Sequence, residues 1–267
     1  MEKHDDLKIN NLSIDEWIDK GEKKTSPNLQ ELEKYDFKNV AFLDLLAMKD
    51  LVYNEKDDSA AIQKMKKIKG IIDIETKSIA LDPDFILTHF SDSFIFTCSE
   101  KHMLDLVSLL ATIQMRILVE CQFQLRGAVT YGKVKVTDAG KDIIGPAYID
   151  AFKLEQKSAI YPRIIIHNNF LDKFCEKHPN SSEIILTTDN EKIIDYLGHF
   201  VTSEEKNKKS KEEIILFLKR EKVFRFLSER YAEFKKKNDH AIKQKYGWTI
   251  QYFLMKGIWH ESTNINW

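Results

Sequence analysis

Apolar runs and amphipathic segments alternate through the first part of the chain. Residues 39–48 (NVAFLDLLAM) are almost continuously apolar, which predicts a short buried strand interrupted by one carboxylate, Asp44. Residues 60–75 carry isoleucine and methionine near helical spacing with lysines elsewhere, which predicts an amphipathic helix packed on a sheet. Residues 85–99 predict two strands joined by a tight Ser-Asp-Ser turn.

The alternation of helices and strands continues beyond this hairpin. Residues 104–122 have the clearest helical pattern in the chain, and residues 125–136 alternate as a strand does. A returning strand, a further helix and a short buried strand are predicted at 143–146, 147–159 and 162–167. Elements in this order predict an α+β fold, in which helices pack on an antiparallel sheet of the ferredoxin-like type.

The two ends of the chain differ in composition from this middle part. The beginning is polar and charged, and a charge run at 204–213 precedes two long amphipathic helices predicted at 214–237 and 239–255. We therefore expect an N-terminal arm, a core and a helical C-terminal extension packed on the core, at residues 1–37, 38–178 and 179–267.

Charge and cysteine content exclude several classes of protein. The 267 residues include 41 basic and 42 acidic side chains, so the basic excess that holds a protein on nucleic acid is missing. The N-terminus has no apolar signal segment, and the most apolar stretch carries Arg116 and Glu120. Three cysteines without a CxxC pair indicate neither a disulfide scaffold nor a zinc site. We expect a cytoplasmic protein that binds neither nucleic acid nor membrane.

Two carboxylates lie where a strand and a hairpin are predicted. Asp44 interrupts an apolar strand, and Asp92 lies at the hairpin tip between two serines. A carboxylate in an apolar strand is costly unless it is paired, hydrogen-bonded or bound to a metal. Adjacent carboxylates repel each other unless a divalent cation lies between them, and hard cations prefer oxygen ligands. Alternatively, Asp44 caps a helix and Asp92 makes an ordinary turn.

The motifs around these carboxylates resemble a known catalytic core. In order, they are Phe42-Leu-Asp-Leu-Leu-Ala-Met, Phe90-Ser-Asp-Ser-Phe-Ile, Leu125-Arg-Gly-Ala-Val-Thr-Tyr-Gly and Gly145-Pro-Ala with Leu154-Glu. Together they resemble the class III nucleotide cyclases. The segment from Ala147 to Ile164 and the C-terminal Lys245-Tyr-Gly-Trp with Tyr252-Phe are similar to one branch of that family, the pyrimidine cyclases of the bacterial Pycsar anti-phage system.

The resemblance implies a two-metal phosphoryl transfer. Asp44 and Asp92 would hold two Mn²⁺ or Mg²⁺ ions, with the backbone carbonyl of Leu45 as a further ligand, while the ribose 3′-hydroxyl attacks the α-phosphorus. It also implies a homodimer with sites at the interface, a ribonucleoside triphosphate as substrate, and a separately encoded effector that the cyclic nucleotide activates.

Three positions depart from the family pattern. Many class III cyclases carry an Asn and an Arg where this chain has Ile149 and Lys153, and Ala47 stands where a Gly is common. Lysine keeps the charge of arginine but loses its bidentate fork. Arg126 and Arg163 are the arginines that would compensate, unless they are structural ion-pair partners.

The sequence therefore predicts a cyclase that makes a 3′,5′-cyclic pyrimidine monophosphate, with UTP favoured over CTP, as the signal generator of anti-phage defence. The predicted catalytic residues are Asp44, Asp92, Arg126, Lys153 and Arg163. Two alternatives remain open at this point, namely an adenylate or guanylate cyclase and a non-catalytic cyclase-fold dimer that binds nucleotide.

Overall fold

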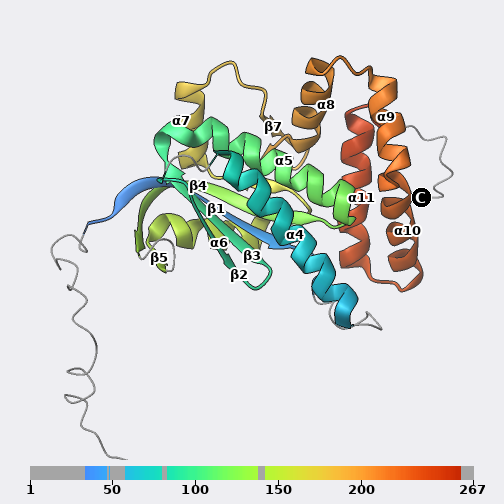
Figure 1. Ribbon diagram of the computed structural model, residues 1–267, viewed down its shortest axis with the longest axis horizontal. Coiled ribbons are helices and arrows are strands. Elements are labelled where there is room, and N and C mark those ends of the chain that lie inside the picture. Colours follow the sequence, from blue (N-terminus) through green and yellow to red (C-terminus); the bar gives the residue numbers. More distant parts are fainter. Residues whose placement is uncertain (1–33, 47, 49–57, 80–82, 138–141, 260–267) are drawn as a thin grey trace, which may run out of the picture. The chain divides into compact units, whose positions relative to one another are not determined.

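A computed structural model describes residues 34–46, 48, 58–79, 83–137 and 142–259 (Figure 1). The chain divides into two units, residues 1–34 and 35–267, and the second is described below. Residues 1–33 of the predicted N-terminal arm, and Ala47, lie outside the described residues. No helix in the described part of the chain is both long and apolar enough to cross a lipid bilayer.

The fold is mixed α+β, as predicted, and is built around an eight-stranded sheet. The strand order is β2-β3-β1-β4-β6-β8-β7, with β5 paired to β4. Both neighbours of β1 run antiparallel to it, whereas β6 lies parallel to β4. The strands are β1 (Asp36–Leu45), β2 (Ile86–Phe90), β3 (Ser93–Ser99), β4 (Leu125–Thr137), β5 (Asp142–Ile144), β6 (Ile164–Ile166), β7 (Ile184–Leu186) and β8 (Lys192–Ile194).

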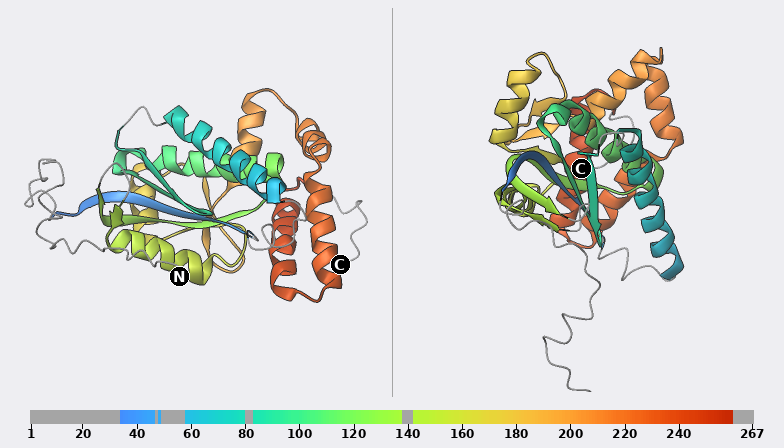
Figure 2. Two further views of the ribbon diagram at one scale, coloured as in Figure 1. Left: turned by 60° about the horizontal axis from the view of Figure 1, so that its bottom comes forward. Right: turned by 60° about the vertical axis from the view of Figure 1, so that its left-hand side comes forward.

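Helices cover both faces of the sheet. Helices α4 and α5 lie on one face and α6 lies on the other (Figure 2, left). The first four strands with α4 and α5 follow the order β-α-β-β-α-β, which is the ferredoxin-like arrangement. The described helices are α4 (Asp58–Ile79), α5 (Met103–Cys121) with a preceding 3₁₀ turn (Glu100–His102), α6 (Pro146–Ser158), α7 (Asn168–Lys177), α8 (Tyr196–Lys206), α9 (Lys211–Arg220), α10 (Val223–Lys236) and α11 (His240–Met255).

The alternation of side chains along β1 decides which face Asp44 occupies. Leu43 and Leu45 belong to the core cluster that contains α4 and α5. Phe42 belongs to a second cluster with Ala147 and Ala151 of α6. Because successive strand residues point to opposite faces, Asp44 lies on the face that α6 covers.

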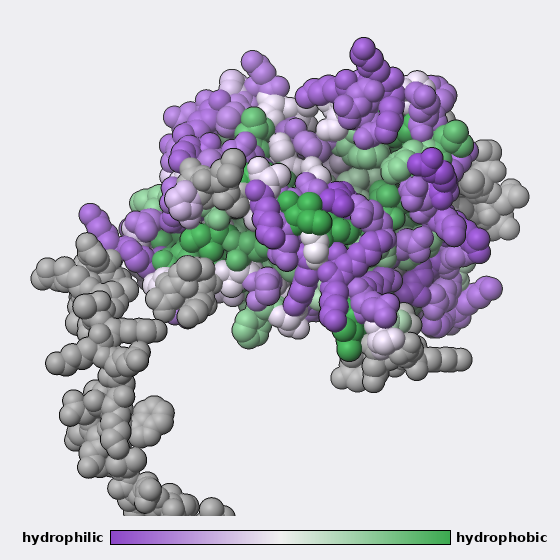
Figure 3. Space-filling model, viewed as in Figure 1, coloured by the Kyte–Doolittle hydropathy of each residue, from purple (hydrophilic) through white to green (hydrophobic). Residues whose placement is uncertain are grey.

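The C-terminal helices share the core of the sheet. Ile214, Leu218 and Phe253 are fully buried and belong to the same apolar cluster as β1 and α5. On the face shown in Figure 3, hydrophilic side chains cover most of the outer surface of α8 and α9. These helices therefore present their apolar side to the sheet layer and its helices.

Two expectations for the C-terminal part were wrong in detail. The helix predicted over 214–237 is two helices, because Lys222 has a φ of 62° and ends the first. Continuing one helix from the buried Leu218 would turn Glu221 and Lys222, three and four residues later, into the core. The part beyond residue 178 is also not wholly helical, since β7 and β8 extend the sheet. Their short isoleucine runs are too brief to show a period.

Candidate active site

Asp44 and Asp92 lie at the same end of two neighbouring strands. Asp44 pairs with Ser93 across β1 and β3, and Asp92 is the residue before Ser93 in the hairpin turn. The backbone N–H of Leu45 donates to the carbonyl of Asp92 at 3.3 Å, which joins the two segments directly. The predicted juxtaposition of these two positions is therefore present in the fold, and Asp44 is a strand residue rather than a helix cap.

Arg126 lies opposite Asp44 on the other neighbouring strand, β4. Its Nε and Nη2 both donate to Asp44 Oδ2, at 3.2 and 3.1 Å. The next residue, Gly127, lies so close to β1 that an added Cβ would come within 2.5 Å of Leu43 and of the Phe42 carbonyl. Glycine at 127 thus permits the close strand contact that brings Arg126 to Asp44.

A third carboxylate completes this group. Glu155 of α6 has no exposed side-chain surface, and its Oε1 lies 2.7 Å from Arg126 Nε. The single hydrogen of that nitrogen is donated to Asp44, so the contact with Glu155 is an ion pair rather than a hydrogen bond. Arg126 is therefore held between Asp44 and Glu155.

Burial raises the pKa values of both carboxyl groups that contact Arg126. For Asp44, removal from water is the largest effect, Arg126 opposes it, and the negative charge of Asp92 adds to it. For Glu155, burial again dominates over the opposing effect of Arg126, and Asp44 adds to it. Negative charge at this end of the sheet is thus only partly compensated by Arg126, and an additional cation would stabilise it.

The donor set fits a hard divalent cation. Carboxylate oxygens of Asp44 and Asp92, together with a backbone carbonyl at Leu45, are the oxygen ligands that Mg²⁺ and Mn²⁺ prefer. Among the described residues, no three His, Cys, Asp or Glu side chains form a metal-binding group.

The side chains of the other two predicted residues, Lys153 and Arg163, have different surroundings. Lys153 is exposed on α6, and Ile149, one turn earlier, is 47% exposed. Arg163 is 2% exposed and pairs with both carboxylate oxygens of Asp189, at 2.8 and 2.7 Å. Its guanidinium also lies over the Trp248 ring at 5.7 Å. The structure brings Asp44, Asp92 and Arg126 together, whereas the Lys153 side chain is exposed and the Arg163 side chain pairs with Asp189.

The pair of Arg163 with Asp189 predicts a pH effect on stability. Hydrogen bonds from Arg163 are the main cause that lowers the pKa of Asp189 from 3.8 to about 2. A carboxylate with a lowered pKa stabilises the fold above its ordinary value, and this contribution disappears as the pH falls through the folded pKa. Between about pH 4 and about pH 2, we expect the free energy of unfolding to fall further in wild type than in Asp189→Asn. The difference should be about 1 kcal/mol or less, because Asp189 is 44% exposed and solvent screens its charge. Urea unfolding of both proteins at each pH measures this difference, and equal losses would contradict it.

Two charged residues near Asp44 were not among the predicted site residues. Glu155 continues the buried face of α6, four and eight residues after the buried Ala151 and Ala147. This spacing is a sequence signal that Glu155 is buried and therefore paired. The positive charge of Lys245, on α11, acts on both Asp44 and Glu155. Lys245 belongs to the Lys245-Tyr-Gly-Trp motif, but that motif does not indicate its proximity to Asp44, which depends on how α11 packs.

Comparisons with known proteins give similarities in structure only. No protein-family model and no curated protein matches the chain. A bacterial light-regulated adenylyl cyclase is similar, with a TM-score of 0.47, 13% identity, and coverage of 61% of this chain and 92% of that chain. So is the adenylyl cyclase CyaB from P. aeruginosa, with a TM-score of 0.45, 16% identity and coverage of 61% and 95%. The guanylate cyclase domain of RhGC from Catenaria anguillulae, in complex with GTP, has a TM-score of 0.46, 12% identity and coverage of 60% and 95%.

Proposed function

We propose that the chain is a nucleotide cyclase, which converts a ribonucleoside triphosphate into its 3′,5′-cyclic monophosphate and pyrophosphate. The observation that carries this proposal is the placement of Asp44 and Asp92 at the same end of neighbouring strands, with Arg126 beside Asp44. The motifs around these residues resemble those of class III nucleotide cyclases.

Asp44, Asp92 and the Leu45 carbonyl would hold the metal ions, two per site, as Mn²⁺ or Mg²⁺. When bound, such ions lower the pKa of the ribose 3′-hydroxyl and neutralise the departing pyrophosphate. Arg126 supplies a fixed positive charge beside these carboxylates, and its planar guanidinium suits phosphate oxygens. Glu155 orients Arg126 from the α6 side through the 2.7 Å contact at Nε.

We further propose that two copies of the chain form the working enzyme, with the sites at their interface. Exposed apolar side chains support this, because Phe90 is 79% and Phe152 is 42% exposed. Both line a groove of about 430 Å³ that also contains Phe42, two residues before Asp44 on the α6 face. In the proposed dimer, a second copy of the chain fills this groove.

For the substrate, we propose a pyrimidine nucleotide, with UTP favoured over CTP. The support is the resemblance of the motifs to the pyrimidine cyclases, and the presence of Ile149 and Lys153 where many class III cyclases have Asn and Arg. The proposed biological role is that of a signal generator in anti-phage defence, whose product activates a separately encoded effector.

The proposal is tested by incubating the purified chain with each of the four ribonucleoside triphosphates and Mn²⁺ or Mg²⁺. We expect cyclic UMP and an equal amount of pyrophosphate as the main products, with Asp92→Asn as the inactive control. A cyclic purine product would contradict the pyrimidine proposal and leave the cyclase proposal standing. If no triphosphate is consumed beyond the Asp92→Asn background, catalysis is contradicted, and nucleotide binding without turnover becomes the function to test.

A further inference from the structure

We propose that Lys245 of α11 binds the polyphosphate of the nucleotide, together with Arg126, so that the C-terminal helices supply part of the substrate site. This inference rests on the proposed function for the identity of the ligand. It depends on where α11 packs, on which residues of α11 face the sheet, and on the charges that surround Asp44.

Helix α11 packs against the end of the sheet that carries Asp44 and Arg126. Gln124, two residues before Arg126, donates from Nε2 to Thr249 Oγ1 of α11 at 2.8 Å, and both side chains are buried. The carbonyl of Gln124 accepts from the backbone N–H of Leu46, two residues after Asp44, at 2.9 Å. One residue thus joins the end of β1, the start of β4 and α11. In Figure 2 (left), β1 runs toward the C-terminal helices.

Lys245 lies on the face of α11 that makes this contact. It precedes Thr249 by four residues, and the Thr249 hydroxyl donates to the Lys245 carbonyl at 3.3 Å. Residues four apart lie one above the other on the same helix face. Lys245 is partly buried, whereas its neighbour Gln244 is exposed.

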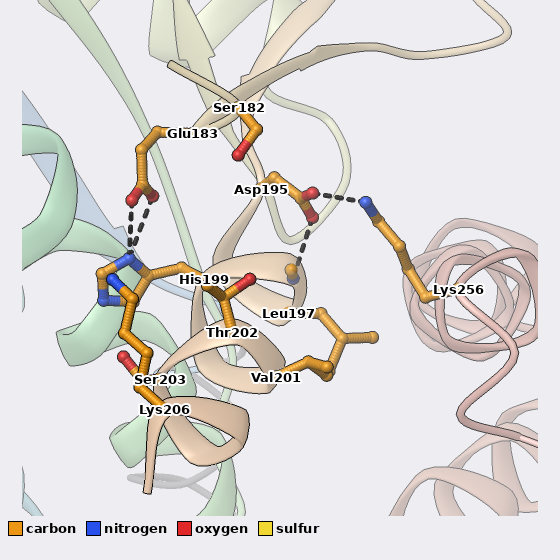
Figure 4. Close-up of a pocket in the computed structure, with 11 residues that line it drawn as sticks. Ser182, Glu183, Asp195, Leu197, His199, Val201, Thr202, Ser203, Lys206 and Lys256 are labelled. Atoms are coloured by element: carbon orange, nitrogen blue, oxygen red, sulfur yellow. Dashed lines mark hydrogen bonds and ion pairs between the residues drawn. The ribbon is translucent and has the colours of Figure 1, made fainter. Parts of the chain in front are cut away.

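Further contacts fix the position of α11. Trp248 stacks on Tyr161, which precedes β6, with ring centroids 6.0 Å apart and planes 7° apart, and Arg163 lies over the same Trp248 ring. At the C-terminal end of α11, Lys256 pairs with the Asp195 carboxylate (Figure 4). The same carboxylate accepts from the Gly198 N–H at the start of α8. Arg163 thus contributes to the site indirectly, by holding the helix that carries Lys245.

The charges at this end of the sheet favour a cation that binds a polyanion. Asp44 and Glu155 both have Arg126 and Lys245 as neighbouring cations, and Asp92 adds a further negative charge near Asp44. Lysine is a compact charge on a flexible stem, so the Lys245 ammonium could reach the phosphate oxygens of a nucleotide bound beside Asp44 and Arg126.

The test measures binding of inorganic tripolyphosphate to the full chain by calorimetry, with and without Mg²⁺, and steady-state kinetics with the triphosphate that the chain turns over. We expect Lys245→Met to weaken tripolyphosphate binding about tenfold or more and to raise KM by a similar factor, with a much smaller change in kcat. Lys245→Arg keeps the charge and is expected to restore binding. The matched control is Lys243→Met on the same helix, whose ammonium lies over the Tyr231 ring.

The outcomes separate this inference from the proposed function. If wild type makes a cyclic nucleotide and Lys245→Met has wild-type KM and tripolyphosphate affinity, the inference is overturned and the cyclase proposal stands. If no triphosphate is cyclised but tripolyphosphate binding still requires Lys245, the cyclase proposal fails and the phosphate site stands. Absence of tripolyphosphate binding to wild type, or failure of Lys245→Arg to restore the binding that Lys245→Met loses, also overturns the inference.

Discussion

Asp44→Asn is expected to reduce nucleotide turnover about 100- to 1000-fold or more without lowering the stability of the fold. Asparagine keeps the shape of the side chain but removes the negative charge that would hold the metal ions, and removing one such electrostatic group from an active site has effects of this order. The stability prediction follows from burial, which raises the pKa of Asp44 despite the adjacent Arg126.

A carboxyl group whose pKa is raised in the folded state supports folding fully only below its ordinary pKa. This contribution is lost as the pH rises through the pKa of the folded state. At neutral pH the ionised Asp44 therefore lowers the stability of the fold, whereas the uncharged asparagine does not. Arg126 keeps its contact with Glu155 in the variant. We therefore expect a melting temperature equal to or above that of wild type, measured by circular dichroism beside the activity assay. A clearly lower melting temperature would contradict the stability prediction, and retained turnover would contradict the proposed role of Asp44 in metal binding.

Leu218→Ala is expected to destabilise the whole chain by about 2–5 kcal/mol, because Leu218 is fully buried in the core that α9 shares with the sheet. For a chain of this size, the melting temperature should fall by roughly 4–20 °C. The transition should remain single, since residues 35–267 form one compact unit.

Leu216→Ala in the same helix is the matched control. Leu216 is 66% exposed, so this variant makes the same chemical change in α9 while removing little buried surface, and its stability should stay within about 0.5 kcal/mol of wild type. Any effect of helix propensity is common to both variants and cancels in the comparison. Equal effects of the two substitutions, or a separate early transition for the C-terminal helices, would show that α9 does not share the core.

Local patterns were sufficient for most of the elements as far as β6, whereas the face of the sheet that carries Asp44 became clear from the packing. The alternation of β1 separates Leu43 and Leu45 from Phe42 and Asp44, and the two clusters of the structure follow that separation. The same kind of reasoning applied to α6 would have identified Glu155, because it follows two buried alanines at helical spacing. The break at Lys222 was likewise indicated by the charged residues that one continuous helix would bury.

Periodicity and motif order by themselves determined the order of strands and helices from β1 to β6, the α+β class and the position of two carboxylates on neighbouring segments. These features are set by the backbone geometry of a few consecutive residues, which the chain shows directly. Only the tertiary structure decided that Arg126 is held between Asp44 and Glu155, that Arg163 pairs with Asp189, and that Lys245 belongs with the acidic group. These contacts join residues far apart in sequence, such as Gln124 and Thr249 at a separation of 125, and depend on how whole elements pack together.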